Sequence, residues 1–246
     1  MGTKTTTTNR SNPARPLAWK GTRPIACEIF IYAFVIFLLS AATYSRNRIW
    51  TSETALWADC MKKSPNRDRP HLILGNALFH DGMYQEAIVQ YIEAIHLNPN
   101  FAEAHNNLGS IFLHQGKYEE AILHFTEALR IKPDFAEASN NLGHVLLKQR
   151  KYEEAIPHFI EALRINPDYA KAHNNLGYIF LNQGKYQEAI LHLTEAVRIN
   201  PGFAEAHYLL GDAYFKMGNR SPALREYEIL KTMNPTFANI LYQKIK

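Results

Sequence analysis

Residues 102–135 read AEAHNNLGSIFLHQGKYEEAILHFTEALRIKPDF, and this stretch decides the fold. In its first half, Leu108 and Phe112 lie one helical turn apart, and in its second half Ala121 and Phe125 do the same. Apolar residues at three- and four-residue spacing predict amphipathic helices rather than strands. The stretch is therefore predicted to form two helices, each with one apolar face.

Two punctuating residues support this pair of helices. Gly116 stands between the two apolar runs, where it suits a left-handed helix end, and Pro133 follows the second run, where it stops the helix. The pattern returns every 34 residues, so that the units are 68–101, 102–135, 136–169, 170–203 and 204–237. One helix pair cannot bury its apolar face alone, but about three or more stacked pairs can.

A 34-residue period with Leu-Gly early, Ala-x-x-x-Phe/Tyr late and Pro at the end resembles the tetratricopeptide repeat (TPR). The resemblance implies an all-α, right-handed α-solenoid of helix pairs. Residues 45–67 are expected to form a junction with a degenerate half-repeat, and residues 238–246 a C-terminal capping helix. In the third unit, Arg150 replaces the turn glycine, which is expected to strain a left-handed position, and Pro157 falls within the second helix, where it is expected to shift the helix start or bend the helix.

The formal net charge of +4 lies at one end of the chain. Residues 1–23 carry five basic residues and no acid, whereas residues 45–246 carry 22 basic and 22 acidic residues. A nucleic-acid surface requires Lys and Arg clustered on one face, which a balanced repeat region does not offer. No nucleic-acid partner is therefore predicted. The Thr-rich tail 1–23 has no apolar periodicity and is expected to be disordered.

Residues 24–44 are the most apolar stretch of the chain, with Glu28 as the only charge. A helix of about 20 apolar residues spans a bilayer, so a transmembrane signal anchor is predicted before the solenoid. A signal peptide cleaved after Ala42 and a buried core helix remain open as alternatives. The excess of basic residues before the segment favours a cytoplasmic N-terminus and a TPR domain in a periplasm or lumen.

The first helix of each unit is expected, by resemblance, to line a concave groove through positions 2, 5, 6, 9, 12 and 13 of the unit. The three middle units carry Asn at positions 5 and 6, and an Asn amide matches a peptide unit in donors and acceptors. The TPR part of the O-GlcNAc transferases is similar, because its Asn ladder binds peptide main chain. The candidate peptide-binding residues are Asn107, Asn141 and Asn175 at position 6, Asn106, Asn140 and Asn174 at position 5, and Asn76, His144, Tyr178 and Asp212 at position 9. Alternatively, the Asn pairs merely suit the repeat and bind water.

Other kinds of site are not indicated by the sequence. Positions 5 and 6 hold no base, which argues against the carboxylate clamp of chaperone-binding TPR domains. Histidines at equivalent positions of successive units are expected to lie too far apart to share one metal ion, whose bonds are about 2 Å long. No phosphate loop, nucleophile elbow or paired-carboxylate cluster is present, so we predict no cofactor, no metal and no enzyme activity.

The stretch 43–50, TYSRNRIW, together with 55–57 and 63–66, carries a second resemblance. It is similar to the segment that joins the last membrane helix to the repeats in transmembrane-and-TPR O-mannosyltransferases and their bacterial membrane relatives. The catalytic part of that family is a multi-span domain, which this chain with one apolar span is expected to lack. The sequence thus predicts a membrane-anchored scaffold for protein partners. An accessory or truncated subunit of a membrane O-glycosyltransferase system and a secreted, cleaved TPR binding protein are the alternatives.

Overall fold

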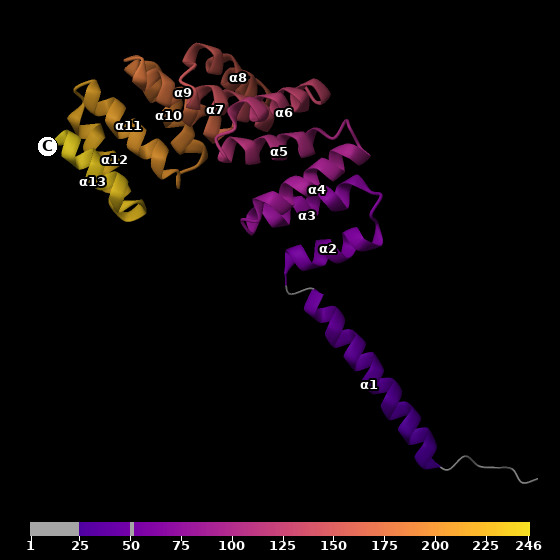
Figure 1. The fold of residues 1–246 in the computed structure, drawn as a ribbon. Helices are drawn as coiled ribbons and strands as arrows, with labels where there is room; N and C mark the ends of the chain where they lie inside the picture. The colour runs from indigo at the N-terminus through magenta and orange to yellow at the C-terminus, as the bar shows by residue number, and fades with distance from the viewer. Residues whose placement is uncertain (1–24, 50–51) are drawn as a thin grey trace, which may run out of the picture. The chain divides into compact units, whose positions relative to one another are not determined.

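The computed structural model describes residues 25–49 and 52–246, and Figure 1 shows them as a ribbon. Contacts divide the chain into two units, Met1–Ser52 and Glu53–Lys246, which are described separately. The tail 1–23 and Pro24, for which disorder and the start of a membrane segment were predicted, lie outside the described residues.

The first unit contributes one described helix, α1 (Ile25–Ile49), which covers nearly all of the apolar segment. Its large apolar side chains between Tyr32 and Tyr44 are exposed, with Phe37 at 67% and Leu39 at 63%. Within 25–49 and 52–246, however, no helix reaches the combined length and apolarity of a membrane span. The prediction of a transmembrane helix over residues 24–44 is therefore not confirmed.

The second unit is a stack of helix pairs, which confirms the all-α TPR solenoid (Figure 1). The pairs are α3 (Asp68–His80) with α4 (Tyr84–Leu97), α5 (Ala102–His114) with α6 (Tyr118–Ile131), α7 (Ala136–Lys148) with α8 (Tyr152–Ile165), α9 (Ala170–Asn182) with α10 (Tyr186–Ile199), and α11 (Ala204–Lys216) with α12 (Arg220–Met233). Helix α2 (Glu53–Lys63) precedes them and α13 (Pro235–Ile245) follows them.

The first four helix pairs close through a glycine of the first helix that faces a large side chain of the second helix. A Cβ atom placed on Gly109 of α5 would lie 2.9 Å from Cε1 of Phe125 on α6, which is closer than side chains approach. Gly143 faces Phe159 and Gly177 faces Leu193 in the same way. Phe125, Phe159 and Leu193 are fully buried, so this contact forms the centre of these repeats.

The turn between the two helices of a pair requires a left-handed residue. Four of the five turns use glycine, for example Gly116 with φ 74° and Gly218 with φ 80°. Arg150 occupies that position in the third repeat with φ 61°, which confirms the expected strain, because a Cβ atom disfavours this conformation. Pro157 lies inside α8, and α8 still begins at Tyr152, the repeat position at which α6 begins with Tyr118.

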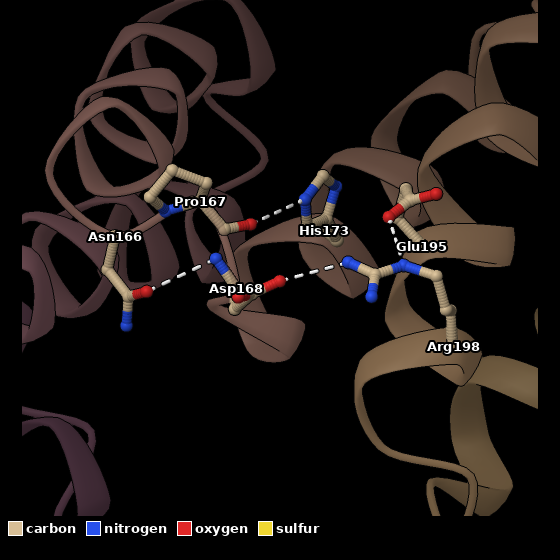
Figure 2. Close-up of polar contacts among 6 residues, drawn as sticks. All are labelled: Asn166, Pro167, Asp168, His173, Glu195 and Arg198. Carbon is tan, nitrogen blue, oxygen red and sulfur yellow. Dashed lines mark hydrogen bonds and ion pairs between the residues drawn. The ribbon is translucent and has the colours of Figure 1, made fainter.

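Short loops join one repeat to the next, and Figure 2 shows the loop between α8 and α9. The backbone N–H of Asp168 donates to Oδ1 of Asn166 at 3.1 Å, which closes a tight turn around Pro167. The next repeat holds the loop through Nε2 of His173, 3.2 Å from the Pro167 carbonyl oxygen. Arg198 of α10 donates to Asp168 at 2.9 Å and to Glu195 at 2.7 Å, although these side chains are exposed and contribute little to stability.

Both ends of the solenoid are covered by single helices. Trp57 and Met61 of α2 pack against Leu74 and Leu78 of the first repeat. At the other end, Leu241 of α13 is fully buried with Ala223 and Leu230 of α12. Helix α13 starts three residues before the predicted cap, because Asn234 accepts hydrogen bonds from the N–H groups of Thr236 and Phe237 and so begins the helix there.

Candidate functional site

The first helices form one continuous layer, since α5 contacts α7, α7 contacts α9 and α9 contacts α11. Three hollows lie along this layer. The first hollow, about 280 Å³, includes Asn76, Asn107, Ser110 and Glu137. The second hollow, about 330 Å³, is lined by Ser110, Leu113, His114, Tyr118, His144 and Lys148. The third hollow, about 250 Å³, includes His144, Lys148, Arg150, Asn175, Tyr178 and Glu205.

The three hollows are parts of one groove. Ser110 belongs to both the first and the second hollow, and His144 belongs to both the second and the third. The predicted site residues Asn76, Asn107, His144, Asn175 and Tyr178 all line this groove. These five side chains therefore lie in a groove on the first helices, as predicted. That they bind a ligand stays a prediction.

The position-5 asparagines do not line the groove. Asn106, Asn140 and Asn174 are 1–3% exposed and lie beneath it. Two of them accept a hydrogen bond from the position-6 asparagine of the following repeat: Nδ2 of Asn141 lies 3.0 Å from Oδ1 of Asn106, and Nδ2 of Asn175 lies 3.1 Å from Oδ1 of Asn140. The asparagines therefore form a ladder that joins one repeat to the next.

The ladder leaves part of each position-6 amide free. Asn107 donates one hydrogen bond to Oδ1 of Asn76 at 2.8 Å and accepts one from Asn106 at 3.3 Å. An Asn amide has two N–H donors and an oxygen with two lone pairs. Asn107 and Asn175, which are half-buried and line the groove, thus each retain hydrogen-bonding capacity for a ligand.

The ladder stops at the fifth repeat. Position 6 of that repeat is Leu209, which has no donor to offer. Oδ1 of Asn174 is buried, and because the donor is missing it accepts no hydrogen bond from any residue in the described part of the chain. A buried polar atom left without a partner costs about 1–3 kcal/mol, so this is a weak point in the stack.

Asp212, predicted at position 9 as a ligand-selecting residue, lies elsewhere. It is 4% exposed, and its Oδ1 lies 2.9 Å from Nζ of Lys244 on α13, while its Oδ2 lies 3.8 Å from Nζ of Lys216. The sequence analysis predicted a capping helix over residues 238–246, but it did not predict that Lys244 of this cap would lie over the Asp212 carboxylate. Asp212 therefore holds α13 against α11 in the free protein.

The histidines join the two helices within a repeat. Position 4 faces position 23: Nδ1 of His105 lies 3.1 Å from Nδ1 of His124, and the same atoms of His173 and His192 are 3.0 Å apart. Burial lowers the pKa of all four imidazoles, so each pair shares a hydrogen bond as neutral rings. In the fifth repeat, the hydrogen bond that Nδ1 of His207 donates to the Glu226 carboxylate at 2.6 Å instead raises the pKa of His207.

These close histidine pairs are not the ones that the sequence analysis compared. The sequence argument compared histidines of successive repeats, whereas the close pairs come from two helices of one repeat. Across 25–49 and 52–246, no group of three or more His, Cys, Asp or Glu residues is arranged to hold a metal ion.

The sequence prediction missed the charged residues of the groove. Glu137 lines the first hollow, Lys148 the second and third, and Arg150 and Glu205 the third. Glu137 and Glu205 are at position 2 and Lys148 is at position 13, both of which were expected to face the groove. A prediction that included every charged residue at positions 2 and 13 would have named Glu137, Glu205 and Lys148.

Family models match most of the repeat region. Two models described as Tetratricopeptide repeat match residues 140–202 and 180–245, and a model described as TPR repeat matches residues 75–116 and 109–150. No curated protein sequence matches the chain. The resemblance of the junction to O-mannosyltransferases therefore stays a prediction.

Solved structures share the fold. YrrB, described as a TPR protein with an unusual peptide-binding site, is 24% identical over 76% of this chain and 97% of its own, with a TM-score of 0.58. PilF of Pseudomonas aeruginosa is 24% identical over 68% of this chain and 76% of its own, with a TM-score of 0.64. PilW, described as a widely conserved type IV pilus biogenesis factor, is 20% identical over 80% of this chain and 91% of its own, with a TM-score of 0.67. At identities this low, the similarity shows that these proteins share the fold and nothing more specific.

Proposed function

Because the chain belongs to the tetratricopeptide repeat proteins, we propose that it is an interaction scaffold that binds an extended segment of a partner protein along its first helices. The observation that carries this proposal is the groove formed by three hollows that share Ser110 and His144. YrrB, a protein of the same fold, is described by its peptide-binding site, which is consistent with this use of the groove.

The chemistry of the groove suits a peptide main chain. Asn107 and Asn175 offer free amide donors and acceptors at two points, and these can pair with backbone C=O and N–H groups whatever the side chains are. Between them, Leu113 and Tyr118 provide apolar surface in the second hollow. The binding mode is therefore an extended segment held by its backbone, with side chains entering the hollows.

The test uses residues that line the groove without belonging to the ladder. A display library of random 12-residue peptides is selected on the full-length protein, and the selected peptides are measured against His144→Ala and Tyr178→Ala. We expect about tenfold weaker binding by each variant, which corresponds to about 1.4 kcal/mol. Leu123→Ala and Leu191→Ala, on exposed positions of α6 and α10, are the matched controls and should bind unchanged.

Replacing the asparagines themselves would confuse the result. An Asn141→Ala or Asn175→Ala variant removes a donor from a buried oxygen and so lowers stability as well as binding. If the selected peptides bind equally to the wild type and to both groove variants, the groove is not the binding site and the proposal is wrong.

We propose in addition that α1 attaches the scaffold to a membrane, with the repeats on the extracytoplasmic side. No described helix qualifies as a span, so this proposal rests on the apolar sequence 24–44 and on the exposed aromatic and aliphatic side chains between Tyr32 and Tyr44. An apolar surface of this extent is not normally left in contact with water, and it marks a site of membrane or protein interaction.

Carbonate extraction of membranes from expressing cells tests the attachment. The full chain should stay in the membrane pellet, and a variant without residues 25–44 should be released. N-terminal sequencing of the recovered protein distinguishes an anchor from a signal peptide: a first residue at Thr43 would establish cleavage and a secreted binding protein. An accessory role in a membrane glycosyltransferase system rests on residues 43–66 alone, and co-purification without any such enzyme would count against it.

A further inference from the structure

The three hollows of the groove differ in charge and polarity. The first hollow contains the carboxylate of Glu137, beside the amides of Asn76 and Asn107. The second hollow has apolar surface from Leu113 and Tyr118, and its other lining residues are Ser110, His114, His144 and Lys148. The third hollow contains two basic side chains, Lys148 and Arg150, and one acid, Glu205. The groove is thus acidic at the α5 end, apolar in the middle and net basic toward α9.

The charges in these hollows are not neutralised by neighbouring side chains. Elsewhere on the solenoid, acids such as Glu127 and Glu161 are paired with Arg130 and Arg164 at 2.7 Å. Glu137, by contrast, accepts a 3.3 Å hydrogen bond from Asn106, and no basic side chain of the described residues lies within ion-pair distance of it. Lys148 and Arg150 likewise form no ion pair within 25–49 and 52–246. These charges are available to a ligand.

The spacing of the hollows follows from the stacking of the helices. The first helices of adjacent repeats contact each other, and packed helix axes lie about 8–10 Å apart. A peptide in the extended polyproline II conformation advances about 3.1 Å per residue with about three residues per turn, so side chains three residues apart lie on one face about 9 Å apart and can enter adjacent hollows.

We infer that the groove selects extended peptides that present a basic, an apolar and an acidic side chain, about three residues apart, to the first, second and third hollows. This inference rests on the proposed function and adds the class of peptide that is bound. Electrostatic complementarity of this kind contributes to specificity more than to affinity. The backbone contacts would hold any extended peptide, and the charges would decide which of these peptides binds more tightly.

The probes are short synthetic peptides with blocked ends and serine at all other positions. The first carries Lys, Leu and Asp at three-residue spacing, and the second carries Glu, Leu and Asp. Both are fluorescein-labelled, and their binding to the full-length protein is followed by anisotropy at low ionic strength. We expect the Lys-Leu-Asp peptide to bind about fivefold more tightly, which is the effect of about 1 kcal/mol from exposed charges.

A reversed charge on the protein should reverse the preference. In Glu137→Lys, the Glu-Leu-Asp peptide should become the better ligand by a similar factor. Glu120→Lys, at an exposed position of α6 outside the three hollows, is the matched control and should keep the wild-type order. Equal affinities for the two peptides, or the same order in Glu137→Lys as in the wild type, would overturn the inference.

The test separates this inference from the proposed function. If library-selected peptides bind and are lost in Tyr178→Ala, but show no charge order, then the groove binds peptides without the inferred pattern. If the Lys-Leu-Asp peptide and the library both fail to bind, the charge pattern and the peptide groove are both wrong.

Discussion

The middle repeats and the fifth repeat have the same helices but different polar contacts. In the third and fourth repeats, the position-6 asparagine donates to a buried asparagine of the preceding repeat, as Asn175 does to Asn140. In the fifth repeat that position is Leu209, and the lost donor leaves Oδ1 of Asn174 without a hydrogen-bond partner among the described residues. The fifth repeat is held instead by α13, whose Lys244 lies over Asp212. Repeats with the same arrangement of helices therefore differ in their polar contacts: interior repeats are linked by a side-chain network, and the last repeat has an ion pair to the cap.

The largest effect that separates the two regions is expected at the buried asparagines. Asn140→Leu leaves the Asn175 amide without its acceptor and should lower the free energy of unfolding by about 1–3 kcal/mol. Asn174→Leu removes an oxygen that has no partner, and should lower it less or raise it. Urea unfolding of the full-length variants, followed by circular dichroism at 222 nm, measures both. Equal losses would contradict the ladder.

A double-mutant cycle sharpens the contrast at the end of the ladder. Leu209→Asn supplies a donor to Oδ1 of Asn174 but also removes a buried apolar side chain. Measured against Asn174→Leu, the coupling between the two positions should favour the Asn-Asn pair by about 1 kcal/mol, since this isolates the new hydrogen bond from the lost apolar burial. A coupling free energy near zero would show that Leu209 does not interrupt the ladder.

A smaller effect is expected at the turns. Arg150→Gly in the third repeat should raise the free energy of unfolding by about 0.5–1 kcal/mol, because glycine adopts φ 61° without a Cβ penalty. Gly218→Arg in the turn of the fifth repeat is the reciprocal change and should lower it by a similar amount. Thermal unfolding compares the three proteins, and a lower midpoint for Arg150→Gly would contradict the assignment of strain to this turn.

The smallest expected difference concerns pH. Burial lowers the pKa of His105 and His124, so the stability that this neutral pair contributes is present above the unfolded pKa and is lost as the pH falls below about 6.5. The hydrogen bond that His207 donates to Glu226 raises the pKa of His207, so its contribution is present below that pH and is lost as the pH rises through the folded pKa.

Two variants reveal these opposite signs. Glu226→Gln should destabilise the protein more at pH 5.5 than at pH 7.5, when compared with the wild type in urea. His124→Gln removes a ring that resists protonation, so its cost should be smaller at pH 5.5 than at pH 7.5. If a variant loses the same free energy of unfolding at both pH values, the histidine that it probes has the same pKa in the folded and unfolded states, which would contradict the prediction.

The repeat fold was readable from the sequence because its determinants are local. Helix periodicity, the turn glycines and the closing prolines all act within one 34-residue unit, and even the strain at Arg150 followed from its place in the repeat. The positions that face the groove were also predictable, as the place of His144 and Tyr178 shows.

What the sequence did not show depends on contacts between units. Whether an asparagine faces a ligand or a neighbouring asparagine is decided by the next repeat, so Asn106 and Asn140 were not distinguishable from Asn107 and Asn175. Asp212 was misjudged for the same reason, because its partner Lys244 lies on α13, beyond the last repeat. Side chains that recur at one position have the same sequence signal whether or not they are buried.

The asparagine ladder also determines where the solenoid can be lengthened. A copy of residues 136–169 inserted after the third repeat would find an acceptor in the original Asn140 and would offer its own to Asn175. The same copy placed after the fifth repeat would meet Tyr208 and Leu209, which provide neither amide. Duplication is therefore tolerated in the interior of the array, and each added copy would extend the peptide track by about three residues of ligand.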